Sequence, residues 1–468
     1  MLRLGFAGII MIVASCTSLE IRNDSDLTIV RGELLTMHGE PIRIWNQTAS
    51  YHAVLTTDSF QVELSLKEPG YFKLQYGTSN ADLYLTPGQD LVVVSAREAN
   101  GLHFEGRSAA SNNYLSRYQL FIDSIMPSEG RLYGSNEADF YAAVSQVRDA
   151  SLDYLSNFIV SHHNLDPVFF EKERARIWYR WGLLLSTFPS LRGYLSQGQM
   201  NVSPSYYSFQ KELSLDESGL LAIPEYLPYV LKVIYNEGQR ISAEGNSQPE
   251  HEVAFNLISN MISNPLVKDH CYHRVMQNIL KSGDLQLAEQ LMRSFKQNTQ
   301  TSTLRREIVS HYLIRKNLEP GNQAPSIMLC DEENNKWQSD QFFGEYLYLF
   351  AWKIDCPACI PVLKELEYLA NDFKEYPIRY LAVCLDTSRQ DQFEIKQSSS
   401  LQNFQIDTEF SSEFRTRYLI DGLPRAILID PEGNLLNAFA PLPSSHNLRK
   451  YLRDALDSSS HDHTFNAY

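Results

Sequence analysis

The chain is poor in cysteine, in positive charge and in long apolar runs. Only 6 of its 468 residues are cysteine, and once those with a separate role are set aside an odd number remains, which argues against a disulfide framework. Its 41 basic residues face 56 acidic ones, and the net charge of −15 argues against nucleic acid as a partner, because phosphates would be repelled. Beyond the N-terminus no apolar stretch is long enough to span a membrane.

What the chain contains is typical of a folded protein with more than one core. Hydrophobic residues make up 43% and aromatic residues 12% of the sequence, which excludes a disordered protein. A length of 468 residues is too great for one ordinary core. We therefore expect two or three domains.

The strongest chemical signal is a pair of cysteines near the C-terminal end. A continuous apolar run, 346–352, is followed by Cys356 and Cys359 with two residues between them, and then by apolar residues at helical spacing. This pattern predicts a buried strand feeding a helix whose first turn holds both sulfurs. The unpaired N–H groups and the positive end of the helix dipole stabilise a thiolate there, which is the species that attacks a disulfide.

Two other interpretations of this pair are a structural disulfide and half of a zinc site. A zinc site needs a second ligand pair, and no second pair with this spacing follows in the sequence. His270 and His273 are three residues apart and could share a helix face, but no third ligand is visibly tied to them. We therefore favour redox chemistry, without a metal or another cofactor.

Downstream motifs point the same way. Residues 421–433 contain Pro424 at the start of an apolar strand and then a Pro-Glu-Gly turn, and residues 321–325 read Gly-Asn-Gln-Ala-Pro. Together with Trp352, four residues before the first cysteine, residues 319–458 resemble the TlpA/ResA group of extracytoplasmic thiol–disulfide oxidoreductases. The resemblance implies an α/β thioredoxin-like fold.

The same resemblance implies roles for individual residues. Cys356 is the attacking thiol and Cys359 the resolving one. Pro424 is cis, rather than a trans proline at a strand entry, and leaves the backbone of Leu423 to pair with an extended substrate segment as an added strand.

Two positions depart from the family pattern. Relatives carry Trp immediately before the first cysteine, whereas Asp355 stands here, and its carboxylate opposes the thiolate unless Lys353 compensates. We take Trp352, Lys353 and Asp355 as residues that tune the site. Phe350 replaces the buried acid of thioredoxin; Asp386 is an alternative proton acceptor, although a strand-end Asp is more often a turn or cap residue, so the acceptor is unassigned.

A peroxidase site is not expected. Sites of the peroxiredoxin type resemble P-x-x-x-T/S-x-x-C, and the positions of the Pro and of the Thr or Ser are occupied here by Leu349 and Lys353.

The N-terminus predicts export. Arg3 precedes a short apolar run, Leu4 to Val13, typical of a secretory signal over residues 1–15. Val13 to Cys16 resembles a bacterial lipobox, which implies a lipidated Cys16 followed by a polar tether over residues 16–25; an ordinary signal peptide is the alternative. Because residue 17 is Thr rather than Asp, we expect attachment to the outer membrane, facing the periplasm.

Hydrophobic periodicity divides the rest of the chain. Residues 26–107 alternate apolar and polar side chains between frequent turns, which predicts an antiparallel β-sandwich and resembles the N-terminal β-domain of Bacteroidota lipoproteins that carry thioredoxin-like domains. Residues 108–318 change to helical spacing and predict an all-α domain, with Gly130, Pro189 and Gly238 among the residues expected to separate its helices.

Within the thioredoxin-like domain, 319–458, strands and helices are expected to alternate around a mixed sheet, and residues 459–468 are expected to form a flexible tail. The strands are expected at 326–330, 346–352, 378–385, 426–430 and 435–439, and the helices at 358–373, 390–398, 411–418 and 445–457.

Two functional hypotheses follow. The first is a lipid-anchored enzyme of the cell envelope that reduces or isomerises disulfides in exported proteins and is recharged by a membrane electron-donor protein. The second is a redox-gated scaffold lipoprotein whose β and helical domains recognise a partner. Pro357 and Ala358 between the cysteines lack the His of strongly oxidising variants, which favours the reductase direction.

Overall fold

A computed structural model describes most of the chain; the N-terminal segment with Cys16, several internal segments and the C-terminal end lie outside the described residues. Two compact units, Met1–Trp178 and Tyr179–Tyr468, divide the chain. No helix among the described residues is long and apolar enough to cross a bilayer. The described residues are 27–33, 42–46, 49–56, 59–76, 79–94, 102–162, 166–195, 202–243, 248–354, 356–385, 401–406 and 410–460.

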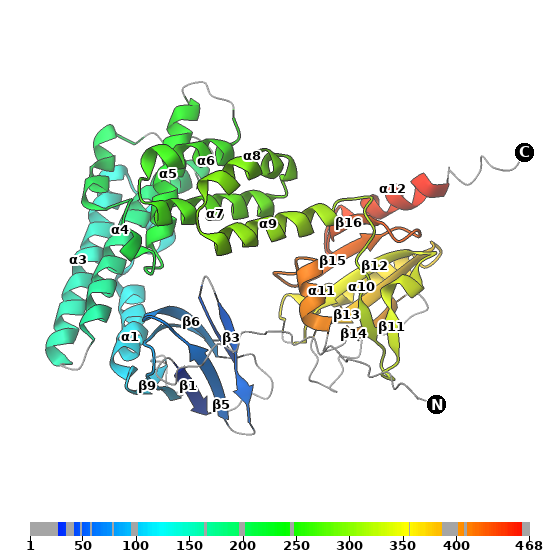
Figure 1. Ribbon diagram of the computed structural model, residues 1–468, viewed down its shortest axis with the longest axis horizontal. Coiled ribbons are helices and arrows are strands. Elements are labelled where there is room, and N and C mark those ends of the chain that lie inside the picture. The colour runs from blue at the N-terminus through cyan, green and yellow to red at the C-terminus, as the bar shows by residue number, and fades with distance from the viewer. Residues whose placement is uncertain are drawn as a thin grey trace, which may run out of the picture. The chain divides into compact units, whose positions relative to one another are not determined.

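The first unit begins with two facing sheets, drawn in blue in Figure 1. One sheet has the order β4-β5-β1-β8-β9 and the other β3-β2-β6-β7. Alternate side chains such as Phe60, Val62 and Leu64 enter one shared core, as the period-two pattern predicted. The strands are β1 (Leu27–Glu33), β2 (Ile42–Trp45), β3 (Ser50–His52), β4 (Val54–Leu55), β5 (Ser59–Ser65), β6 (Gly70–Tyr76), β7 (Ser79–Leu85), β8 (Leu91–Val94) and β9 (His103–Gly106).

The sandwich is not purely antiparallel. β1 and β8 pair in parallel, with Val30 opposite Leu91, although both strands also have antiparallel neighbours. Residue alternation reports which face of a strand is buried, but it carries no information on strand direction. The expected β-sandwich is therefore confirmed, with one of its two sheets mixed rather than antiparallel throughout.

Helices follow the sandwich, and α4 joins it through buried charges. Glu173 on α4 is fully buried and accepts a hydrogen bond of 2.7 Å from the Tyr71 hydroxyl of β6. Arg176 lies 3.4 Å from Glu173 and 2.7 Å from Asp82 of β7. Burial raises the pKa of Asp82, but Arg176 and Lys73 together outweigh it and leave that pKa below its ordinary value. The helices are α1 (Ala109–Ile125), α2 (Glu129–Gly134), α3 (Glu137–Ser161) and α4 (Pro167–Leu195).

Two residues expected to separate helices lie inside them in the second unit. Pro189 removes the hydrogen bond that its amide would give to the Leu185 carbonyl, but the Tyr206 hydroxyl donates to that carbonyl instead, at 3.0 Å, so α4 continues. Gly238 lies inside α5 (Tyr226–Ala243), where Val253 of α6 comes within 3.3 Å of the place of a Cβ atom. The expectation was wrong for both residues, and also for Gly130, which lies inside α2.

The last helices of the helical region are fixed by side-chain caps. Gly283 adopts a left-handed conformation, φ 83°, and ends α7, while the Asp284 side chain caps α8. The buried Asp269 carboxylate accepts hydrogen bonds from the backbone of Gln300 and Thr301 and so anchors the start of α9. These helices are α6 (Glu250–Met261), α7 (Pro265–Ser282), α8 (Leu285–Asn298) and α9 (Ser302–Asn317).

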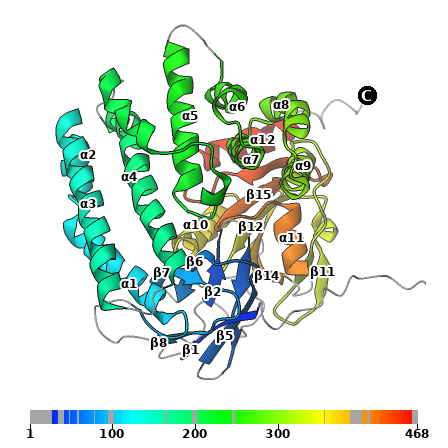
Figure 2. The same ribbon diagram turned by 60° about the vertical axis from the view of Figure 1, so that its left-hand side comes forward.

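A seven-stranded mixed sheet completes the second unit, in the order β11-β10-β14-β13-β12-β15-β16. Helices α10 and α12 cover one face, whereas α11 and the end of α9 pack on the other, and Figure 2 shows α9 beside α11. Its elements are β10 (Met328–Cys330), β11 (Lys336–Gln338), β12 (Tyr346–Trp352), α10 (Cys359–Asp372), β13 (Ile378–Cys384), β14 (Leu401–Ile406), α11 (Ser411–Arg417), β15 (Arg425–Ile429), β16 (Leu435–Ala440) and α12 (Leu448–Ser460).

The predicted elements of this sheet are found with small shifts at their ends, and two further strands are present. β14 has the sequence Leu-Gln-Asn-Phe-Gln-Ile, and its polar residues gave no strand signal in the sequence. It nevertheless pairs with both β10 and β13. β11 is an exposed edge strand of three residues. The helix expected at 390–398 lies outside the described residues.

Candidate active site

Strand β12 carries the site because it lies deep in the sheet. It pairs in parallel with β13 and antiparallel with β15, and all seven of its residues are buried. Tyr348, Phe350 and Trp352 enter the core under α10 and α12, while the alternate residues, such as Leu347 and Leu349, enter the opposite core. A strand buried on both faces gives the continuous apolar run seen in the sequence, and it holds the following turn in a fixed position.

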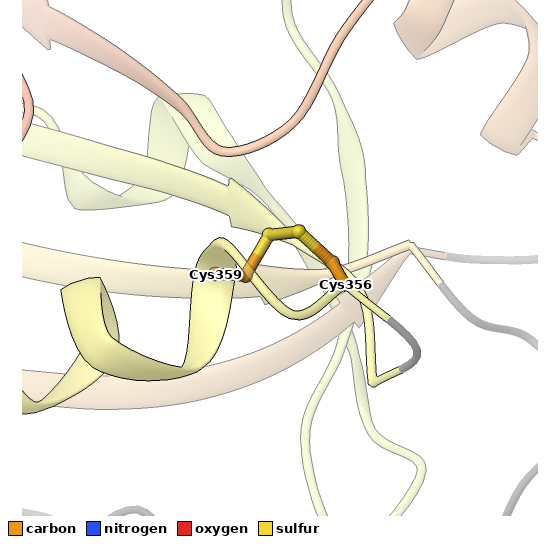
Figure 3. The surroundings of a disulfide bond; sticks show 2 residues. All are labelled: Cys356 and Cys359. Carbon is orange, nitrogen blue, oxygen red and sulfur yellow. A yellow bond between two sulfur atoms is a disulfide. The ribbon is translucent and has the colours of Figure 1, made fainter. Parts of the chain in front are cut away.

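The turn after β12 places the two sulfurs together. The Cys356 amide donates to the Lys353 carbonyl at 3.3 Å, and the Cys359 amide donates to the Cys356 carbonyl at 2.9 Å. Cys356 and Cys359 form a disulfide, with their Cα atoms 5.2 Å apart, at the start of α10 (Figure 3). Because α10 begins at Cys359, Cys356 lies in the turn before the helix rather than in its first turn.

The two cysteines differ in exposure. Cys359 is 0% exposed, whereas Cys356 is half-buried and is followed by the exposed Pro357 and Ala358. Ala358 is the N-cap of α10 and offers no side-chain oxygen, so no cap competes with a sulfur at this helix end. A thiol partner from solution therefore reaches Cys356, while Cys359 is held behind it.

The predicted proline loop lies at the same edge of the sheet. The Leu423–Pro424 peptide bond is cis, the conformation that the family resemblance implied. Arg425, the first residue of β15, is opposite Ala351 near the end of β12, so the chain enters β15 beside the end of the strand that leads to the cysteines. Leu423 and Cys356 pack against the same apolar cluster, which includes Cys359.

The structure describes two of the three residues that are expected to tune the site. Trp352 is buried in the cluster that contains Cys359, and Lys353 is half-buried in the turn. Phe350, which stands where thioredoxin has its buried acid, is fully buried in the same cluster. Asp355 and the alternative proton acceptor Asp386 lie outside the described residues.

The histidines considered as metal ligands have other surroundings. His273 on α7 lies 3.1 Å from Glu307 of α9, and burial lowers the pKa of both His270 and His273. No group of three His, Cys, Asp or Glu side chains placed to hold a metal ion occurs in the described part of the chain.

Sequence reasoning missed one feature near the proline loop. A cavity of about 290 Å³ lies between α9 and the segment from α11 to Asp421. Its walls come from residues more than a hundred positions apart, such as Glu307 and Asp421, so no local pattern could have indicated it.

The exposure difference predicts selective labelling of the reduced protein. Iodoacetamide at pH 7 is expected to modify Cys356 first and to leave Cys271 untouched, because Cys271 is fully buried and burial raises its pKa from 9.0 to about 12. A rise of this size lowers the thiolate fraction about a thousandfold. Mass spectrometry of each cysteine-containing peptide measures this, with labelling in denaturant as the control; comparable rates at Cys271 and Cys356 would contradict it.

Comparison with known proteins supports the fold of this region. Residues 320–440 match the family model described as AhpC/TSA family, and no curated protein matches the chain. A crystal structure of a candidate thiol-disulfide oxidoreductase from Bacteroides vulgatus is 27% identical, with 30% of this chain and 98% of that one covered and a TM-score of 0.27.

Two further solved structures cover the same region. The thioredoxin domain of a thiol-disulfide oxidoreductase from Bacteroides vulgatus is 23% identical, with 30% of this chain and 99% of that one covered and a TM-score of 0.27. A thiol:disulfide interchange protein from Bacteroides sp. is 22% identical, with coverages of 32% and 99% and a TM-score of 0.28. The family match and the sheet described above show that the C-terminal part of the chain contains a thioredoxin-like domain that matches the AhpC/TSA family model and is similar to thiol-disulfide oxidoreductases of Bacteroides.

Proposed function

We propose that this protein is an extracytoplasmic thiol–disulfide oxidoreductase that reduces or isomerises disulfides in exported proteins through Cys356 and Cys359. One observation carries the proposal. The two cysteines form a disulfide at the start of α10, one half-exposed and one buried, at the sheet edge where the cis Leu423–Pro424 bond lies. This is the arrangement that an attacking and a resolving thiol need.

The exchange proceeds in two steps from the reduced protein. The Cys356 thiolate attacks one sulfur of the substrate disulfide, so the substrate S–S bond breaks as a bond between Cys356 and the substrate forms. Cys359 then attacks Cys356, the bond to the substrate breaks, and the bond between Cys356 and Cys359 forms. Two electrons pass to the substrate, and the two protons of the reduced pair end on its sulfurs.

The protein must then be reduced again. A membrane electron-donor protein with a dithiol is the proposed source of the two electrons. The proposed location is the periplasmic face of the outer membrane, with attachment through a lipid on Cys16, which the sequence Val-Ala-Ser-Cys at 13–16 supports.

The test is a substrate trap in the cell envelope. In a Cys359→Ser variant expressed with its N-terminal segment in a host of the Bacteroidota, the second step cannot occur, so we expect mixed disulfides between Cys356 and exported proteins in the membrane fraction. Non-reducing gels and mass spectrometry of the captured proteins measure this.

Two variants serve as controls for the trap. A variant with serine at both Cys356 and Cys359 must capture nothing, and a Cys16→Ser variant is expected to leave the membrane fraction. Equal capture by the variant with both serines would reject the proposed chemistry, and retention of Cys16→Ser on the membrane would reject the anchor.

A further inference from the structure

The cavity between α9 and the proline loop is built from two parts of the second unit. Helix α9 comes from the helical region, and the opposite wall belongs to the thioredoxin-like domain. About 290 Å³ is small for a whole cofactor, because ligand pockets run from about 300 to 1,000 Å³, but it accommodates one long side chain. The charged and polar residues that line it are Glu307, Ser310, His311, Arg415, Thr416 and Asp421.

The cavity lies next to the segment that pairs with substrate in the proposed function. Asp421 is three residues before Pro424, a span of at most about 11 Å even for a fully extended chain. A substrate segment paired with Leu423 advances by about 3.3 Å per residue. In a segment that runs from Leu423 towards Asp421, a side chain two to four positions along is therefore within reach of the cavity.

Gly422 leaves open the path from Leu423 to the cavity. No atom lies within 4 Å of the place where its Cβ would stand, and its φ is not in the left-handed region, so the fold itself does not require glycine here. Close approach of another backbone is a common reason for a glycine. A peptide passing over Gly422 from Leu423 towards Asp421 supplies that reason.

The wall of the cavity on the proline-loop side is held in one shape. Leu419 has a positive φ of 49°, which is unusual for a residue other than glycine. Its neighbours fix it there: the Tyr418 hydroxyl donates to the Pro325 carbonyl at 2.6 Å, and the Ile420 amide donates to the Arg415 carbonyl at 2.8 Å. The cavity is thus preformed, which lowers the cost of binding.

Two carboxylates, Glu307 and Asp421, and one guanidinium, Arg415, line the cavity, so the balance of these charges favours a basic ligand. Glu307 is engaged by His273 at 3.1 Å and by the Gln277 amide at 2.9 Å. The exposed Asp421 carboxylate makes no hydrogen bond or ion pair with any residue that the structure describes. Arg425 interacts electrostatically with Asp421 but forms no hydrogen bond or ion pair with its carboxylate, so that carboxylate is open to a cation from outside. The net charge of −15 attracts basic segments at longer range.

We infer that this cavity is a specificity subsite, in which Asp421 and α9 receive a lysine or arginine side chain of the substrate near its disulfide. The inference depends on the proposed function and gives the helical region a part in it. Helix α9 supplies one wall, so the thioredoxin-like domain alone lacks the complete subsite.

Disulfide peptides test this on the full chain. In each peptide one cysteine is joined to 5-thio-2-nitrobenzoate, and the third residue from it is Lys, Leu or Glu. The reduced protein is expected to react with the Lys peptide about fivefold faster than with the Glu peptide. In Asp421→Asn this ratio is expected to fall to about one, because the carboxylate no longer distinguishes the two charges.

A pair of α9 variants separates the cavity from the helix. Ser310→Trp fills the cavity and is expected to slow all the peptides about tenfold relative to the small disulfide 5,5′-dithiobis(2-nitrobenzoate). Leu313→Trp, at an exposed α9 position that does not line the cavity, is the matched control and is expected to behave as wild type.

Four outcomes decide between the possibilities. An unchanged Lys preference in Asp421→Asn, or an equal effect of both tryptophans, overturns the subsite. If the wild-type protein fails to react even with the small disulfide, the proposed function itself fails. Reaction with the small disulfide but no preference among the peptides rejects the subsite and leaves the function standing.

Discussion

Replacement of Cys356 by serine is expected to lower the rate of insulin disulfide reduction by at least about a thousandfold, because a hydroxyl at this position supplies no thiolate to attack a disulfide. Cys356 is the half-exposed member of the pair, so it is the sulfur that a protein substrate can reach. The assay follows insulin precipitation with dithiothreitol as the electron donor.

The Cys359→Ser variant distinguishes the two sulfurs. It keeps the attacking thiol, so it is expected to form the mixed disulfide in a first turnover and then to stall. Cys359 is fully buried, and a serine hydroxyl without a partner there costs about 1–3 kcal/mol of stability. Thermal unfolding of both variants under reducing conditions therefore serves as the folding control.

The outcome also decides between the two functional hypotheses. Activity that survives Cys356→Ser would defeat the enzyme interpretation. The remaining hypothesis would then be the redox-gated scaffold, in which the β and helical domains recognise a partner and the cysteines only change state.

Arg176→Met is expected to lower the free energy of unfolding of the first unit by about 3–5 kcal/mol, because it leaves the carboxylate of Glu173 buried without its cation. The Glu173 side chain is 0% exposed and that of Arg176 is 8% exposed. The substitution also removes the guanidinium that lies 2.7 Å from the Asp82 carboxylate. Urea unfolding followed by tyrosine and tryptophan fluorescence measures the loss.

The chain offers a matched control two residues away. Arg174 pairs with Glu171 at 2.6 Å, but both side chains are more than half exposed, so Arg174→Met is expected to cost less than about 1 kcal/mol. Glu173→Gln combined with Arg176→Met removes both charges and is expected to recover part of the loss. An equal loss of unfolding free energy in the two single arginine variants would show that the buried carboxylate of Glu173 does not depend on Arg176 as its cation.

Much of the thioredoxin-like domain was predictable because its signals are local. The apolar run 346–352 is β12 with the same ends, and residues 430–434 join β15 and β16 in an antiparallel hairpin as expected. The cysteine pair is formed as a disulfide and Pro424 is cis. The strand, the hairpin and the cysteine pair depend on neighbours in the sequence, through burial of a whole strand, turn geometry or the reach between two cysteines, whereas the cis form of Pro424 was implied by the family resemblance.

Other features depended on contacts between distant residues. A proline normally ends a helix. At Pro189 the helix continues because the Tyr206 hydroxyl donates to the carbonyl that the proline leaves without its usual donor. β14 has a polar composition and is a strand because β10 and β13 offer hydrogen-bonding edges on both sides. The direction of β8 relative to β1 likewise came from the packing of the sheet.

The sequence by itself determined where the reactive sulfurs lie, which strand holds them and which proline stands beside them. Only the tertiary structure decided that Cys356 is accessible while Cys359 is buried, and that α9 and Asp421 line a cavity next to the proline loop. The physical reason is that hydrophobic periodicity and turn chemistry act over a few residues, whereas exposure and cavities result from how separate elements pack.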